Sequence, residues 1–358
     1  MKKLLVLIFL LMGLVAAGGA YLSWDFAVKP ASDTKREITI DVPPGSTFHS
    51  LRLTLVQEGL RIPALQTKLW NTLTQASKRL HVGEYSVDTS DSAYAILTKI
   101  LLGPAKSHKL VVVEGTNIWD IQAVFANSLF HLNPSQYQEW LHDPKRLARM
   151  GVPKMTDSRV RPTLEGFLFP ETYTYFKYNS AESVLDAMLS LFEKRVKPIL
   201  MEHPWGATPE GRYKLLTLAS IVEKESGDVG EQAIIASVYW NRIRKGMKLQ
   251  ADPTTIYGLM PLFDGNLHKS DLLGFTPYNT YRITGLPPTP IANPGETAIR
   301  AVVNPATTEY IFFVAKNDGS GKHIFSADYK THARYVEEFQ RKRRTASRGS
   351  PSSNSKSH

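Results

Sequence analysis

The stretch LLTLASIVEKESG, Leu215–Gly227, is an apolar run that ends in two glutamates. Its spacing predicts a helix with an apolar stripe, and Glu223 and Glu225 fall at its end, where a carboxyl group can be held partly dry. Desolvation disfavours the charged form of such a group, so its pKa rises and it keeps a proton to give to a leaving oxygen. The stretch therefore predicts a general acid of the kind that cleavage of a glycosidic bond requires.

The two glutamates point in different directions. At about 100° per residue, side chains two positions apart on a helix diverge by roughly 160°, so Glu223 and Glu225 flank the apolar stripe on opposite sides. One bond can meet only one of them, and Lys224 between them faces solvent. A second interpretation is that both are surface glutamates beside an amphipathic helix. Helix geometry alone does not choose between the two glutamates.

The N-terminal region has two lysines and then runs from Leu4 to Leu22 without a charged residue. At about 1.5 Å per residue, these nineteen residues nearly cross a hydrocarbon core. We expect a retained membrane anchor, with the lysines in the cytoplasm, Trp24 at the outer interface and the remainder outside the membrane. A signal peptide cleaved near residues 18–20 is the alternative, but the run exceeds the usual signal core of up to about 15 residues.

Composition narrows the class of protein. The 358 residues are enough for two or three domains, and 42% apolar content is ordinary for a globular protein. With no cysteine and scattered histidines, we expect neither a metal nor another cofactor. The formal net charge of +10 comes mostly from six basic residues in the Ser-rich stretch 341–358, which carries no acid. This distribution predicts a disordered basic tail and no nucleic-acid binding.

Residues 37–107 have the pattern of a small α+β module. Strands are predicted at 37–42 and 81–87, and helices from a Ser46 cap to about Glu58, after Pro63, and at 90–102. Leu110–Ile121 repeats the plan of an apolar strand, a Gly turn, a Thr or Ser cap and an amphipathic helix. Both copies resemble the opening of a LysM module, a small glycan-binding fold, although a plain strand-turn-helix fits the same pattern.

Residues 133–209 are predicted to be mainly helical, interrupted by the aromatic block EGFLFPETYTY, Glu165–Tyr175. Aromatic side chains at this density fit either the wall of a sugar cleft or a core strand. Glu165 and Glu171 are also candidates for the second carboxylate of a conventional glycosidase.

Polar side chains gather after the two-glutamate helix, in a second helix at 233–245 and in two loops that Gly and Pro restrict. Because these side chains both donate and accept hydrogen bonds, we expect them, with Glu223, to bind a sugar chain around the acidic helix. The candidates are Asn241, Arg242, Gln250, Asp252, Thr254, Tyr278, Asn279 and Tyr281. Arg242 has a second interpretation, in which it holds a carboxylate in a structural pair.

Five motifs occur in one order along the chain. They are LASIVEKE (Leu218–Glu225), YWNR (Tyr239–Arg242), LQADPT (Leu249–Thr254), YNTY (Tyr278–Tyr281) and GLPP (Gly285–Pro288). With the N-terminal apolar run and the closing segments YIFFVA (Tyr310–Ala315) and HIFS (His323–Ser326), they resemble the membrane-anchored, YceG-like family of endolytic murein transglycosylases over nearly the whole chain. Thr289, after the paired prolines, departs from the pattern.

The resemblance implies that Glu225, the second glutamate, is the catalytic residue. It also implies a lytic transglycosylase that cleaves the β-1,4 bond between N-acetylmuramic acid and N-acetylglucosamine in nascent peptidoglycan and leaves 1,6-anhydromuramyl ends, which would end strand elongation. Expected partners are peptidoglycan strands, the cytoplasmic (inner) membrane and peptidoglycan synthases. Two alternatives stay open: a wall-binding scaffold without activity, and a muramidase-type hydrolase with two carboxylates.

The predicted fold class is therefore α+β, with an N-terminal transmembrane helix, a small LysM-like module and a larger mixed α+β catalytic domain. The predicted boundaries are 1–24 for the cytoplasmic end and the anchor, 25–36 for a linker, 37–107 for the module, 108–340 for the catalytic domain and 341–358 for the tail.

Overall fold

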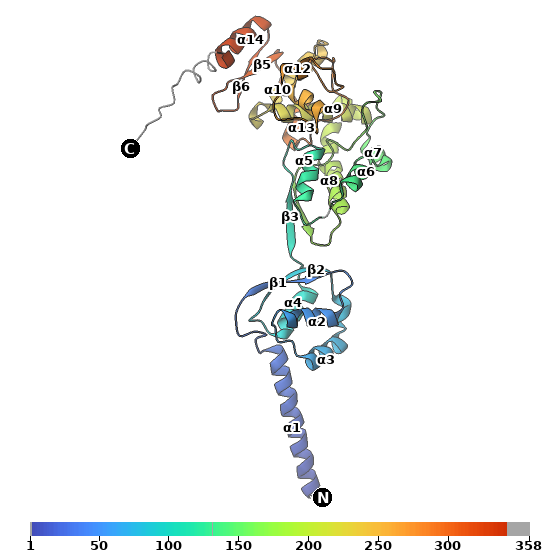
Figure 1. Cartoon of the computed structure of the whole chain (residues 1–358), viewed down its shortest axis with the longest axis vertical. Coiled ribbons are helices and arrows are strands. Elements are labelled where there is room, and N and C mark those ends of the chain that lie inside the picture. Colours follow the sequence, from blue (N-terminus) through green and yellow to red (C-terminus); the bar gives the residue numbers. More distant parts are fainter. Residues whose placement is uncertain (1, 131, 342–358) are drawn as a thin grey trace, which may run out of the picture. The chain divides into compact units, whose positions relative to one another are not determined.

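The computed structural model describes residues 2–130 and 132–341, and it consists of two compact units (Figure 1). The first unit comprises Met1–Lys109 and Thr174–Ser180, and the second comprises Leu110–Tyr173 and Ala181–His358. Both mix helices with short two-stranded sheets. The basic tail predicted at 341–358 lies, from residue 342 on, outside the described residues.

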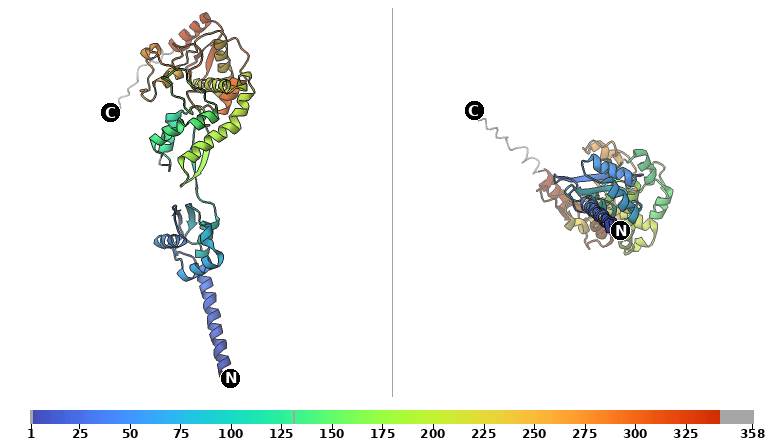
Figure 2. Two further views of the ribbon diagram at one scale, coloured as in Figure 1. Left: turned by 90° about the vertical axis from the view of Figure 1, so that its right-hand side faces the viewer. Right: turned by 90° about the horizontal axis from the view of Figure 1, so that it is seen from below.

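The first unit begins with one uninterrupted helix, α1 (Lys2–Ala27), as the left panel of Figure 2 shows. Its part Leu7–Ala27 is long and apolar enough to cross a membrane. Residues 25–36, which the sequence suggested as a linker, are instead packed against the unit: Phe26 and Ala31 are buried. The amide of Ala31 donates to the carbonyl of Asp91 (2.8 Å), so this segment is fixed by contacts with residues far away in sequence.

The rest of the first unit is an antiparallel pair of strands with three helices. Its elements are β1 (Glu37–Val42), α2 (Phe48–Gln57), α3 (Ala64–Thr74), β2 (Gly83–Asp88) and α4 (Ala93–Leu102). The caps are shifted from the predicted ones: Thr47, not Ser46, caps α2 in a capping box with Ser50. The returning segment 174–180, which the sequence did not assign here, binds through Lys177 and Tyr178 to the carboxylate of Asp41 (both 2.8 Å).

The second unit is largely helical. Its longer elements are β3 (Ser107–Val111), α5 (Ile118–Ala126), α6 (Pro134–Leu141), α7 (Pro144–Met150), β4 (Thr172–Phe176), α8 (Ala181–Met201), α9 (Pro209–Glu225), α10 (Gln232–Arg244), α11 (Asp252–Leu259), α12 (Lys269–Leu273), α13 (Glu296–Val303), β5 (Phe312–Ala315), β6 (His323–Ser326) and α14 (Tyr329–Tyr335). Helix α9 contacts α8, α10 and α13, so it lies at the centre of the unit. Strands β3 and β4 pair with each other and run through the boundary between the units.

The aromatic block that follows Glu165 is part of this core. Phe167, Phe169 and Tyr173 are buried in it, and Tyr175 is buried in the segment that belongs to the first unit, which agrees with core segments and not with a cleft wall. The rings of Phe167 and Phe192 of α8 meet edge to face, with centroids 4.9 Å apart.

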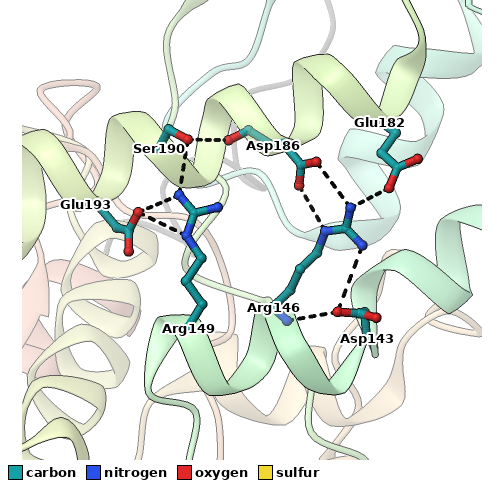
Figure 3. Close-up of polar contacts among 7 residues, drawn as sticks. All are labelled: Asp143, Arg146, Arg149, Glu182, Asp186, Ser190 and Glu193. Carbon is teal, nitrogen blue, oxygen red and sulfur yellow. Dashed lines mark hydrogen bonds and ion pairs between the residues drawn. The ribbon is translucent and has the colours of Figure 1, made fainter.

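Ion pairs connect α7 to α8 (Figure 3). Arg146 binds the carboxylate of Asp186 through two nitrogens (2.9 and 3.1 Å) and also reaches Glu182. One helical turn further along, two nitrogens of Arg149 donate to the same oxygen of Glu193 (3.1 and 2.5 Å). Bidentate pairs such as that between Arg146 and Asp186 fix the position of one helix on another.

Candidate active site

Helix α9 carries both glutamates of the EKE sequence. Thr208 caps its start by accepting a hydrogen bond from the amide of Gly211 (3.0 Å), and residues 215–222 are buried. The helix ends at Glu225, because Ser226 is extended and its hydroxyl donates to the carbonyl of Asp228 (2.6 Å). Glu225 is therefore held in the last turn, where the negative end of the helix dipole opposes ionisation of its carboxyl group.

Glu225 lines a cavity of about 500 Å³ in the second unit. Burial raises the pKa of Glu225 to about 7, and the nearby carboxylate of Asp252 acts in the same direction. A hydrogen bond from Tyr239 and the positive charge of Arg242 oppose this rise. Near neutral pH the side chain can therefore be found with or without its proton, as a group that acts first as an acid and then as a base requires.

Glu223 lies in different surroundings. Its carboxylate accepts a hydrogen bond from the amide of Gly295 (3.0 Å), the residue that caps the start of α13. Burial raises the pKa of Glu223, and the nearby Glu114 adds to this rise. A Cβ atom at Gly295 would come within 2.0 Å of a carboxylate oxygen of Glu114, so a larger residue there would displace the exposed side chain of Glu114. Glu223 thus connects α9 to α13.

Four of the predicted substrate-binding residues line the same cavity as Glu225: Arg242, Gln250, Asp252 and Tyr281. Strand β5 contacts α10, and α14 contacts β5 and β6 (Figure 1). Residues of these C-terminal segments also line the cavity. The remaining lining residues are Leu249, Phe312, Phe313, Val314, Ala315, His323, Tyr329, His332 and Val336.

Arg242 is held by backbone carbonyl groups. Its guanidinium donates to the carbonyls of Ile311 (2.7 Å) and Leu249 (2.6 Å) and lies over the ring of Phe312, 5.4 Å from the centroid. Within the part of the chain that the structure describes, it forms no ion pair with a carboxylate, in contrast to the structural pair considered from the sequence. Arg242 therefore brings a positive charge to the cavity and connects α10 to the segment before β5.

Asp252 and Tyr281 form a hydrogen-bonded pair at the cavity, in which the Tyr281 hydroxyl donates to the carboxylate (2.6 Å). Next to them, Gln250 has a φ of 52°, a left-handed conformation that is uncommon for a residue other than glycine. Its amide donates to the carbonyl of Thr280 (3.2 Å), which holds the loop in this conformation. Local backbone strain of this kind concentrates at functional sites.

The other predicted residues have protein partners and lie outside the cavity lining. Asn241 donates to the carbonyls of Thr308 (2.9 Å) and Tyr310 (2.8 Å). Asn279 donates to three carbonyls, of Asp271 (3.0 Å), Leu272 (3.2 Å) and Gly274 (2.6 Å). The Thr254 hydroxyl shares a hydrogen bond with Thr280 (2.8 Å), and that of Tyr278 shares one with Thr289 (3.0 Å). These side chains brace the loops around the cavity.

The two glutamates considered as a second carboxylate lie elsewhere. Glu165 is 0% exposed and accepts hydrogen bonds from the amide of Ile118 (3.1 Å), the hydroxyl of Tyr257 (2.9 Å) and the side-chain amide of Asn293 (3.1 Å). Burial raises the pKa of Glu165 to about 8. Glu171 pairs with Arg195 (3.0 Å). Neither is among the residues that line the cavity.

Sequence reasoning missed Tyr239, which is buried and hydrogen-bonded to Glu225. Its position three residues before Arg242 puts both on one face of α10, and this spacing was the available signal. It also missed His332, which stacks on Phe312 with ring centroids 4.8 Å apart. The Nδ1 atom of His332 is buried and has no hydrogen-bond partner in the described part of the chain.

A proton-bearing glutamate in a cavity lined by polar and aromatic side chains is typical of enzymes that cleave glycosidic bonds by acid catalysis. Comparison with known proteins identifies the family of the chain. The sequence model of the YceG-like family matches residues 40–338, and the chain belongs to this family.

Individual relatives agree with this assignment. The chain is 29% identical over 332 residues to an endolytic murein transglycosylase of Bacillus subtilis (strain 168), covering 90% of each chain. It is 26% identical to an endolytic murein transglycosylase of Streptococcus pneumoniae serotype 2 (strain D39), covering 94% of this chain and 65% of that protein. The crystal structure of a yceG-like protein from Listeria monocytogenes is 28% identical, covers 84% of this chain and 99% of that one, and gives a TM-score of 0.56.

Proposed function

We propose that the protein is an endolytic lytic transglycosylase of peptidoglycan that cleaves the β-1,4 bond between N-acetylmuramic acid and N-acetylglucosamine. The observation that carries the proposal is Glu225, a carboxyl group with a pKa of about 7 that lines an open cavity. The names of the Bacillus and Streptococcus relatives support the same activity.

In the proposed reaction Glu225 gives its proton to the glycosidic oxygen, which leaves with N-acetylglucosamine. The C6 hydroxyl of the muramyl residue then attacks its own C1, the N-acetyl group can assist at that carbon, and the Glu225 carboxylate takes the hydroxyl proton. The product is a 1,6-anhydromuramyl end, and no water is consumed. Because the nucleophile comes from the substrate, one carboxyl group is enough, unlike the pair that most glycosidases use.

Substrate contacts are assigned to the predicted residues that line the cavity: Arg242, Gln250, Asp252 and Tyr281. The ring of Phe313 offers an apolar surface that a sugar ring can contact, whereas the ring of Phe312 already stacks on His332 and lies under Arg242. His332 also lines the cavity, stacked on Phe312, and burial lowers its pKa, so it lies there as a neutral ring.

A positioning role is assigned to the predicted residues whose polar atoms are already bonded within the protein. Asn241 and Asn279 hold loop carbonyls, and Glu223 holds the start of α13. Thr254 and Tyr278 complete this group through their bonds to Thr280 and Thr289. These residues shape the cavity without touching substrate.

The apolar helix α1 is assigned as a membrane anchor with its N-terminus in the cytoplasm, because the only charges before the apolar run are basic. Anchoring restricts the enzyme to glycan strands near the bilayer, where synthases polymerise them, so cleavage would end the growth of new strands. A LysM-like role for the first unit is supported by its strand, its Gly45 turn and the Thr47-capped helix.

Mass spectrometry of the products tests this function. Wild-type protein and uncrosslinked glycan strands in water labelled with heavy oxygen should yield 1,6-anhydromuramyl ends without label. Labelled reducing ends would instead indicate a hydrolase, and Asp252 would then be the candidate for its second carboxylate, since it shares the cavity with Glu225. Absence of any cleavage would favour the wall-binding scaffold.

A further inference from the structure

Helix α3 of the first unit presents a row of leucines to solvent. Leu65, Leu69 and Leu73 are 57%, 53% and 84% exposed. They are spaced by four residues and so lie along one face of the helix. The opposite face carries Thr67, which is 1% exposed, and Trp70, at the border of the leucine row, packs into the unit. This row, called here the leucine face, is therefore not part of the core.

The position of α3 relative to the apolar helix α1 is fixed by aromatic contacts. Trp70 of α3 meets Phe26 of α1 with ring centroids 6.0 Å apart, and both rings also contact Tyr94 of α4 (6.0 and 5.8 Å). Figure 1 accordingly places α3 beside the C-terminal end of α1. The middle of α3 is thus at the level of the last turn of α1.

This level corresponds to the headgroup layer of a bilayer that α1 crosses. The apolar run ends at Leu22, and Phe26 lies about 6 Å further along the helix axis. The headgroup layer is about 5–7 Å thick on each side of the hydrocarbon core. The first charged group beyond the run, Asp25, lies within 3.9 Å of both Lys29 and Arg61, as expected where the helix leaves the hydrocarbon.

The charge of the surrounding sequence suits the same layer. Residues 59–83 contain Arg61, Lys68, Lys78 and Arg79 and no acid. An apolar helix face with basic residues around it is the pattern of helices that lie in a membrane interface, where anionic lipids attract the cations.

We propose that the leucine face of α3 lies in the outer headgroup layer of the membrane that α1 crosses, so the first unit rests on the lipid surface. The proposal rests on the membrane anchoring proposed above. Two contacts, α1 and α3, then hold the unit, and its orientation on the membrane is fixed where a single spanning helix would leave it free to tilt.

The chain contains no cysteine, so single cysteines introduced into the full-length protein can be labelled one at a time with the fluorophore NBD. The reporter is Leu69→Cys on the leucine face. The matched control is Ser107→Cys, an exposed position of the same unit at the start of β3. Leu14→Cys, in the middle of the apolar run, reports on insertion of α1.

Each variant is reconstituted into vesicles of phosphatidylcholine and phosphatidylglycerol, and quenching by doxyl-labelled lipid is compared with quenching by iodide in the water. We expect the Leu69→Cys label to be quenched several-fold more by lipid, and several-fold less by iodide, than the Ser107→Cys label.

Equal iodide quenching at both positions, with the Leu14→Cys label quenched by lipid, would refute the lipid contact and leave the anchor intact. Protection of Leu69→Cys from both quenchers would mean that a second copy of the chain covers the face, which also overturns the proposal. A Leu14→Cys label outside the lipid would overturn the anchor and the contact together.

Discussion

Two glutamates of the second unit have strongly raised pKa values, about 8 for Glu165 and about 7 for Glu225, in both cases mainly through burial. Their surroundings are opposite. Glu165 is fully enclosed, and protein donors fill both of its oxygens. Glu225 lines a cavity and has Tyr239 as its hydrogen-bond donor. A raised pKa therefore marks a desolvated carboxyl group, and only access to a ligand separates a catalytic acid from a structural one.

The largest expected effect is a loss of activity when Glu225, but not Glu165, is replaced. Glu225→Gln removes the transferable proton while keeping the size of the side chain, so the rate of anhydromuramyl formation should fall about 100- to 10,000-fold. Its melting temperature should stay close to that of the wild type, since the glutamine side-chain oxygen can still accept the hydrogen bond from Tyr239. The measurement is the initial rate from labelled glycan strands. Glu225→Gln with near-normal rates would remove Glu225 from the mechanism.

The matched substitution of the enclosed glutamate, Glu165→Gln, should lower the stability of the fold instead of the activity. In Glu165→Gln the amide nitrogen must face a donor, either the Ile118 amide or the Asn293 side chain, because both are fixed by the fold. One buried donor is left without an acceptor, at a cost of about 1–3 kcal/mol. We expect a lower melting temperature in detergent and, per folded molecule, an activity within a few-fold of the wild type. A large loss of activity at unchanged stability would place Glu165 in the chemistry.

The pH dependence of stability follows from the same two groups. Their pKa values lie above the ordinary value of 4.5, so the folded state binds these protons more tightly than the unfolded state. Their contribution is complete below about pH 4.5 and is lost as the pH rises to about 8, at no more than about 1.4 kcal/mol per unit and group. The melting temperature should therefore fall from pH 5 to pH 8, and less steeply in Glu165→Gln. Equal slopes for both proteins would argue against a raised pKa at Glu165.

The sequence predicted the parts of the site that depend on short-range pattern. Glu225 stands at the end of an apolar helical run, and Arg242, Gln250 and Asp252 follow within about one helix and one turn. The opposite wall could not be predicted in this way, because residues such as Phe312 reach the cavity only through long-range packing of β5 on α10.

The same limit explains the other differences between the predicted and the observed structure. Glu165 could serve as a catalytic or a structural acid until the fold brought Tyr257 and Asn293 to it. Residues 25–36, predicted as a linker, are packed because the ring of Phe26 contacts that of Trp70, more than forty residues away in the sequence. Where two neighbouring residues have equivalent chemistry, as at the start of α2, the pattern gave the helix but not its capping residue.

The smallest expected effects concern how Glu225 is tuned. Activity should fall about tenfold per pH unit above about pH 7, as the acid loses its proton. Tyr239→Phe removes a hydrogen bond that favours the charged form, so the pKa of Glu225 should rise and the alkaline limb should move to higher pH. Asp252→Asn removes a negative charge that favours the protonated form, so the limb should move to lower pH. Each shift should be up to about one unit.

The opposite signs make this pair of variants a sharper test than either alone. Both substitutions nearly preserve side-chain volume, and asparagine at position 252 can still accept the hydrogen bond from Tyr281. Changes in cavity shape would alter the maximal rate without moving the two limbs in opposite directions. Profiles of kcat/KM against pH for the two variants and the wild type provide the measurement. If both limbs stay where the wild-type limb lies, the ionisation that limits activity is not that of Glu225. Its raised pKa would then not distinguish it from Glu165 as the catalytic acid.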